Sequence, residues 1–190
     1  MNPLSKVVYL TFDDGPIPEC TPQLLDILKQ YGVKATFFMV AENAERYPEL
    51  LARVRDEGHV VGNHTYHHMR GCKHDTQTYM QDAIRGAEAL QTTLFRPPHG
   101  RMRNNQKKAL LNQGYTIYLW DVLTHDYNPH YSVDKMLAVV KRYTRNGSIL
   151  VMHDSLKSKD RMLEALPQII EWLQSNGYKT GVLGKMTKSE

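Results

Sequence analysis

The sequence predicts an α/β protein whose core is a mainly parallel β-sheet. Short runs of β-branched and aromatic residues alternate with amphipathic segments that end in glycine. Neither a repeat of fixed period nor a low-complexity linker interrupts this alternation along the 190 residues. Strands that alternate with helices form right-handed βαβ units, so the strands run in parallel. Seven such units can close into a barrel or stay open as a doubly wound sheet, and both place function at the carboxyl ends of the strands.

Seven segments have the composition of buried strands. The first reads KVVYLT and the second ATFFMV, and β-branched and aromatic residues of this kind are enriched in strands. The predicted strands cover residues 6–11, 35–40, 59–63, 94–96, 116–120, 148–152 and 179–183.

Capping signals place helices between these strands. Thr21 and Pro22 are expected to be the N-cap and first residue of the first helix. Asp75 and Ser132 are expected to cap two later helices, and Pro167 is expected to kink or split the last one. The predicted helices cover residues 21–31, 47–57, 75–90, 104–113, 132–146 and the stretch up to 176, most of them followed by glycine.

The composition fits a single domain over residues 1–190 and excludes several classes of protein. Hydrophobic residues make up 41% of the chain and charged residues 23%, which is too apolar for a disordered tail. No apolar run approaches the roughly 20 residues that a membrane-spanning helix needs. The net charge of +4 is mild, and nucleic-acid binding is not expected. The one basic cluster, interpreted as a solvated helix start, contains Arg101, Arg103, Lys107 and Lys108.

The two cysteines and the N-terminus bear on the cellular compartment. Cys20 and Cys72 lie far apart in the sequence, which favours two free thiols in a reducing compartment over a long-range disulfide. The chain shows no signal peptide, so a cytoplasmic location is expected unless an export segment has been removed. The sequence gives no indication of the oligomeric state.

Polar side chains collect where the predicted strands end. The carboxyl ends of parallel strands meet at one edge of a sheet, so these residues are expected to lie together. This convergence after five strands is stronger evidence for a site than any single motif. The residues are Asp13, Asp14, His64, His68, Arg96, His99, Asp121, Asp126, Tyr127 and His153.

Two of these groups have the chemistry of a metal site. His64 and His68 are four residues apart, so a helical turn would place both imidazoles on one face, where they could bind a single ion. Asp13 and Asp14 are adjacent at a strand end, so their side chains diverge and one can bind the metal while the other faces the substrate. The alternatives are a surface histidine pair and an acidic turn.

Arg96 and His153 are candidates for acid–base chemistry at the same edge. Two prolines follow Arg96 and would hold its guanidinium inward, where it could pair with a carboxylate. His153 directly follows an apolar strand and precedes an aspartate. The alternatives are a salt bridge at the root of a loop for Arg96 and a merely hydrogen-bonded histidine for His153.

Five short motifs stand in order at the ends of the predicted strands, at 11–16 (TFDDGP), 64–68 (HTYHH), 96–100 (RPPHG), 126–127 (DY) and 150–154 (LVMHD). They resemble the motifs of the polysaccharide deacetylases, the carbohydrate esterase family 4 proteins built on the NodB homology domain. The resemblance extends from about residue 7 to 183, and it implies a distorted seven-stranded (β/α) barrel.

The resemblance also implies roles for the residues on the metal side of the site. Asp14, His64 and His68 would bind one divalent metal, with zinc as the first choice and cobalt, nickel or manganese as alternatives. Asp13 would be the general base, and Arg96 would orient it and keep it ionised.

On the other side of the site, the family pattern implies that His153 is the general acid and that Asp126 pairs with it. Asp121 is the alternative partner, because the spacing before Asp126 is longer than usual in the family. The backbone N–H of His99 would help to bind the oxyanion, although the family has an aromatic residue at that position. Tyr127 and Val151 would line the acetyl pocket.

The implied activity is hydrolysis of acetyl groups from N-acetylated sugars of a peptidoglycan- or chitin-like glycan. An O-acetyl esterase acting on acetylated xylan is an alternative that uses the same residues. A catalytically silent glycan-binding module is less favoured, because the set of implied site residues is intact.

Overall fold

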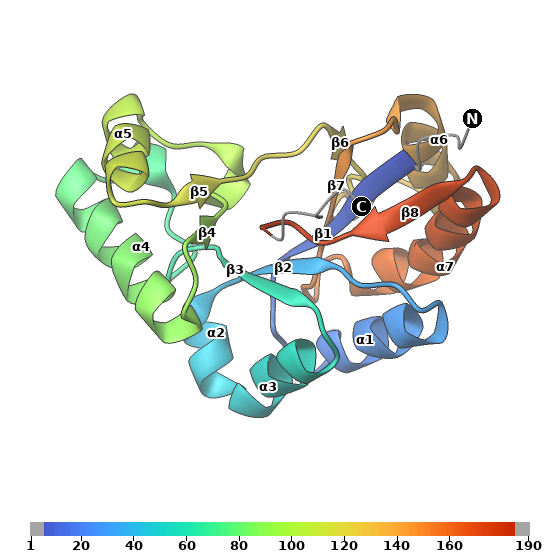
Figure 1. Ribbon diagram of the computed structural model, residues 1–190, viewed down its shortest axis with the longest axis horizontal. Coiled ribbons are helices and arrows are strands. Elements are labelled where there is room, and N and C mark those ends of the chain that lie inside the picture. Colours follow the sequence, from blue (N-terminus) through green and yellow to red (C-terminus); the bar gives the residue numbers. More distant parts are fainter. Residues whose placement is uncertain (1–5, 185–190) are drawn as a thin grey trace, which may run out of the picture.

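The computed structural model describes residues 6–184, and its centre is a curled parallel sheet (Figure 1). The strand order is β5-β4-β3-β2-β1-β7-β6, with β8 also paired to β1, and every strand pair is parallel. The strands are β1 (Lys6–Asp14), β2 (Thr36–Met39), β3 (Val60–Asn63), β4 (Leu94–Phe95), β5 (Thr116–Ile117), β6 (Val122–Leu123), β7 (Ile149–His153) and β8 (Tyr178–Gly181).

The β1 strand is the axis of the sheet and explains its distortion. Its first residues pair with β8 and its last residues with β2, while its other edge pairs with β7. Within residues 6–184 no ladder joins β5 to β6, so the barrel stays open between them. The predicted distorted (β/α) barrel is therefore confirmed. All seven predicted strands form, and sequence analysis missed only the two-residue strand β6.

Helices surround the sheet (Figure 1). Two short 3₁₀ turns, η1 (Gly71–Lys73) and η2 (Pro98–Gly100), lie in the loops after β3 and β4. The helices are α1 (Thr21–Gln30), α2 (Ala41–Arg46), α3 (Pro48–Asp56), α4 (Thr76–Leu90), α5 (Asn104–Asn112), α6 (Val133–Tyr143) and α7 (Lys159–Ser175). The structure describes no helix that is long and apolar enough to cross a membrane.

Two of the three predicted N-caps are confirmed and one is corrected, one helix was missed, and the predicted split at Pro167 does not occur. Asp75 and Ser132 accept hydrogen bonds from backbone N–H groups of the helices that they cap. Thr21 is not a cap: it is the first helical residue, and its hydroxyl donates to Asp154 at 2.6 Å. The helix α2 was not predicted, and α7 continues unbroken through Pro167.

The core lies mainly between the sheet and its helices. Alternate residues of β1 are fully buried there, including Leu10 and Phe12. A smaller apolar cluster around Tyr79, Phe95 and Leu110 fills the space between α4, α5 and β4. The two cysteines are free, with Cys20 buried and Cys72 exposed.

Candidate active site

A cavity of about 670 Å³ opens at the carboxyl ends of the strands. Seven of the predicted site residues line it, coming from the last residues of β1 and β7 and from the segments that follow β3, β4 and β6. They are Asp13, Asp14, His64, His68, His99, Tyr127 and His153. Two others, Arg96 and Asp126, are fully buried and bind to residues of this lining.

The Asp13 carboxylate is held by a buried arginine. Arg96 Nη1 donates to Asp13 Oδ1 at 2.7 Å and also to the hydroxyl of Thr11 at 2.7 Å. Backbone carbonyls of Tyr118 and Leu119 accept further bonds from the same guanidinium, at 3.3 Å each. Because charge-assisted bonds of this kind are strong and directional, Asp13 is fixed in orientation with its Oδ2 left available.

Asp14, His64 and His68 form a cluster with the donor atoms of a metal site. Their ligand atoms all lie within 4.8 Å of one another. Asp14 Oδ1 is 3.7 Å from His64 Nε2 and 3.3 Å from His68 Nε2. Burial raises the pKa of Asp14, but the hydrogen bond from His68 and the nearby His64 outweigh burial and lower this pKa to about 2.

The His64 imidazole is set up as a neutral ligand. Its Nδ1 lies 2.8 Å from the Arg96 carbonyl oxygen and donates to it, so the lone pair is on Nε2 and faces the aspartates. Burial lowers the pKa of His64 to about 4, which keeps the ring uncharged at neutral pH.

The segment that carries the two histidines is not a helical turn, so that expectation is wrong. Thr65 and His68 both have left-handed backbone angles, with φ of 66° and 54°. The imidazoles converge because the loop folds back on itself, and the rings are 5.1 Å apart. The four-residue spacing therefore identified the correct pair of histidines, although a folded loop and not a helical turn brings them together.

Helix α4 holds this loop through Asp82, which sequence analysis missed. Asp82 Oδ2 accepts the backbone N–H groups of Tyr66 and His67 at 3.1 Å each, and Oδ1 binds the His67 ring. A side chain on Gly86, one turn later, would collide with Asn63 and with the backbone at Thr65 and Tyr66. The helix can therefore approach the loop closely, and Asp82 satisfies the buried N–H groups there.

His153 is paired with Asp126 and not with Asp121. Asp126 Oδ1 is 2.8 Å from His153 Nδ1, and Oδ2 accepts the His153 backbone N–H at 2.6 Å. Asp121 instead accepts from Ser148 and from the backbone of Ile149. Burial lowers the pKa of His153, but the bond to Asp126 and the charges of nearby aspartates raise it to about 9, so the ring is protonated at neutral pH.

The remaining predicted residues differ in their relation to the cavity. His99 lines it with a left-handed backbone (φ 59°), and its Nε2 accepts a hydrogen bond from Arg70 at 2.8 Å. Tyr127 packs perpendicular to the His153 ring at 5.1 Å. Val151 does not line the cavity: it is fully buried on the same face of β7 as His153 but two residues deeper, and its partner in register, Leu123, lines the cavity instead.

Six lining residues were not predicted as site residues. Most lie in irregular segments, where no periodicity indicates which way a side chain points. They are Arg70, Arg101, Trp120, Leu123, Ser155 and Lys157.

Known proteins resemble this chain in sequence along nearly its whole length. The model of the polysaccharide deacetylase family matches residues 1–118. A peptidoglycan-N-acetylglucosamine deacetylase of Bacillus cereus is 38% identical over 193 residues, covering 97% of this chain and 70% of the relative. A chitooligosaccharide deacetylase of a Bradyrhizobium species is 34% identical over 194 residues, covering 92% of this chain and 88% of the relative.

Solved structures share the fold. A peptidoglycan N-acetylglucosamine deacetylase in complex with 4-naphthalen-1-yl-N-oxidanyl-benzamide has a TM-score of 0.91 and 37% identity, covering 99% of this chain and 91% of that one. A family 4 carbohydrate esterase from Streptomyces lividans in complex with acetate has a TM-score of 0.86 and 31% identity, covering 96% of this chain and 95% of that one.

The fold also occurs without activity. A pseudoenzyme of the same esterase family from Bacillus anthracis has a TM-score of 0.85 and 27% identity, covering 96% of this chain and 65% of that one. Activity must therefore be argued from the site, whereas family membership follows from the sequence matches. The chain belongs to the polysaccharide deacetylase family, carbohydrate esterase family 4, and carries its NodB homology domain.

Proposed function

We propose that this protein is a metal-dependent hydrolase that removes acetyl groups from N-acetylated sugars of a glycan. The observation that carries the proposal is the placement of two charge-paired groups in one cavity. Asp13, which is paired with Arg96, and His153, which is paired with Asp126, stand on the adjacent parallel strands β1 and β7 and are partners in register. The cluster of Asp14, His64 and His68 lines the same cavity.

The donor set fits a divalent metal, with zinc preferred. Two neutral imidazole nitrogens and one carboxylate oxygen are common ligands of catalytic zinc, and three protein ligands leave coordination positions open. Cobalt, nickel and manganese suit the same donors. When bound, the ion supplies Lewis acidity that polarises a carbonyl oxygen and makes a water molecule more acidic.

The chain's own residues provide the proton transfers that amide hydrolysis needs. Asp13 accepts a proton from the water that attacks the acetyl carbonyl carbon, and Arg96 keeps this carboxylate oriented. As the carbon–nitrogen bond breaks, His153 donates its proton to the leaving nitrogen. The products are acetate and the free amine of the sugar.

Groups around these residues complete the site. The backbone N–H of His99 is proposed to donate to the oxyanion. The left-handed backbone at this residue would turn that N–H group toward the cavity. Tyr127 and Leu123 are proposed to surround the acetyl methyl group, because both line the cavity on the side of His153.

Replacing Asp126 with asparagine is expected to move the alkaline limb of the pH–rate profile to lower pH. The acid form of His153 persists until the pH rises through the raised pKa of about 9. Without the Asp126 charge this pKa falls, so the proton needed by the leaving group is lost at lower pH. Measuring kcat/KM from about pH 6 to pH 10 tests this. Asp121→Asn, the same chemical change outside the cavity, should leave the limb in place.

Replacing Asp82 with alanine is expected to weaken zinc binding about 10- to 100-fold, as changes in the groups that orient metal ligands commonly do. The backbone N–H groups of Tyr66 and His67 would lose their acceptor, and the loop between His64 and His68 would loosen. Competition with a chromogenic chelator measures the zinc Kd. Asp82→Asn keeps an acceptor oxygen and should lose less affinity, and an unchanged Kd in the alanine variant would contradict this role.

The names of the relatives support the proposed substrate class, because they include peptidoglycan and chitooligosaccharide deacetylases. The test is acetate release from N-acetylglucosamine oligomers, peptidoglycan fragments and acetylated xylan, with bound metal measured on the same preparation. Acetate from the first two substrates, and loss of both metal and activity in His64→Ala, are expected. Release from xylan alone would identify an O-acetyl esterase. Full metal loading without release from any substrate would identify a silent module.

A further inference from the structure

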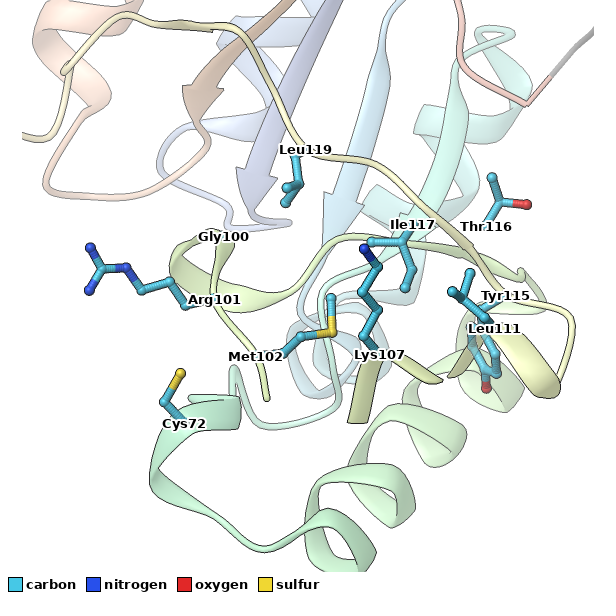
Figure 2. Close-up of a pocket in the computed structure, with 10 residues that line it drawn as sticks. All are labelled: Cys72, Gly100, Arg101, Met102, Lys107, Leu111, Tyr115, Thr116, Ile117 and Leu119. Atoms are coloured by element: carbon cyan, nitrogen blue, oxygen red, sulfur yellow. The ribbon is translucent and has the colours of Figure 1, made fainter. Parts of the chain in front are cut away.

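A groove of about 720 Å³ lies beside the proposed catalytic cavity, between the segment after η2, helix α5 and strand β5 (Figure 2). Two of its lining leucines, Leu111 and Leu119, are each 49% exposed, which is high for large apolar side chains. The apolar part of the lining consists of Met102, Leu111, Tyr115, Ile117 and Leu119.

The groove is also cationic. Arg101 and Lys107 belong to its lining and no carboxylate does (Figure 2). The sequence from residue 89 to residue 120 contains five arginines and lysines and neither aspartate nor glutamate. In the part of the chain that the structure describes, only the buried Arg96 among these five has an acidic partner within 4.0 Å.

The groove adjoins the catalytic cavity directly. Arg101 lines both, and it also lines a third cavity of about 440 Å³ next to them. Leu119 faces the groove and the next residue, Trp120, faces the catalytic cavity. A Cβ on Gly100, which lines the groove, would lie 2.7 Å from Cη2 of Trp120, which lines the catalytic cavity. These two residues are therefore in contact where the groove and the cavity meet.

We propose that this groove binds a short acidic peptide that the glycan carries next to the sugar being deacetylated. The proposal rests on the proposed function and narrows its substrate class to glycans that bear such peptides. Small apolar side chains would cover the leucine and isoleucine surface, and carboxylates would meet Lys107 and Arg101. A neutral glycan would leave these cations unpaired, and a polyphosphate chain would leave the apolar lining in water.

The experiment compares three substrates on the intact protein. They are peptidoglycan fragments with their carboxylate-bearing peptides, the same fragments after enzymatic removal of the peptides, and N-acetylglucosamine tetramer. Lys107→Glu is expected to lower kcat/KM about three- to tenfold on the first substrate, mainly through KM, and to leave the other two unchanged. The loss of kcat/KM that Lys107→Glu causes on the peptide-bearing fragments should shrink at high salt, because exposed charges are screened.

The control is Lys108→Glu, which changes the net charge equally on the same helix but does not line the groove. Equal losses from both variants, or equal losses on all three substrates, would overturn the proposal. If Leu111→Asp instead converts a dimer to a monomer in sedimentation, the groove is an interface between copies and the proposal is wrong. Acetate release itself separates the proposed function from the groove proposal. No release from any of the three substrates refutes the proposed function, whereas release that Lys107→Glu does not change refutes the groove proposal alone.

Discussion

Replacing Asp13 with asparagine is expected to lower acetate release by about 10²–10⁴-fold, the range that general acid–base catalysis supplies. Asparagine keeps the shape of the side chain but cannot accept the proton of the attacking water. The metal ligand in this pair is Asp14, whose Oδ1 faces both imidazoles, so the variant should still bind one zinc ion. Acetate release and zinc content, measured on the same preparation, test both statements.

The variant leaves the buried Arg96 guanidinium without its counter-charge, so its stability must be followed as well. Asp121→Asn is the matched control, since that carboxylate binds Ser148 and the Ile149 backbone outside the cavity. Loss of zinc together with activity in a folded Asp13→Asn protein would show that the two aspartates do not divide their roles as proposed.

Replacing His153 with alanine is expected to reduce hydrolysis of an N-acetyl amide far more than hydrolysis of an activated acetyl ester. An amine leaves poorly unless it is protonated, whereas an activated phenolate needs little help. The difference between the two rate ratios should be about 10²-fold or more. Steady-state rates of the variant and the wild-type enzyme on both substrates give this comparison.

A purely structural role for His153 predicts a different result. Asp126 would lose its partner, the site would loosen, and both substrates would suffer equally together with the melting temperature. His130→Ala, at an exposed histidine, serves as the control for expression and folding. Equal losses on amide and ester would exclude the acid role and direct attention to Asp126.

Much of the fold and of the site could be predicted from the sequence because the signals are local. Buried strands such as β1 and β2 consist of β-branched and aromatic residues, and the polar residues follow directly at their carboxyl ends. Once the strands are parallel, their carboxyl ends meet at one edge of the sheet, and this alone brings these polar residues together. That is why Asp13, Asp14 and His153 were placed together correctly.

The features that were missed depend on tertiary structure. The two residues of β6 become a strand only because β7 lies beside them, and this strand brings Leu123 to the cavity where Val151 was expected. Asp82 lies in the middle of a helix, and nothing in its neighbourhood in the sequence shows that it binds a loop 15 residues earlier. The left-handed backbone at Thr65 likewise depends on packing, since a β-branched residue rarely adopts it.

The pairing of β1 with three strands is expected to give the two halves of the proposed metal site different mobility. Asp14 ends a strand that is hydrogen-bonded to β2, β7 and β8, so its amides should exchange with solvent deuterium only through global unfolding. His64 and His68 lie in a loop outside regular structure that Asp82 holds, so we expect this loop to open more readily than the strand does. Removing zinc should therefore speed deuterium uptake in residues 64–70 while leaving residues 8–13 unchanged. Asp14 would keep its position without the ion, whereas the loop that carries His64 and His68 would close around the ion as it binds.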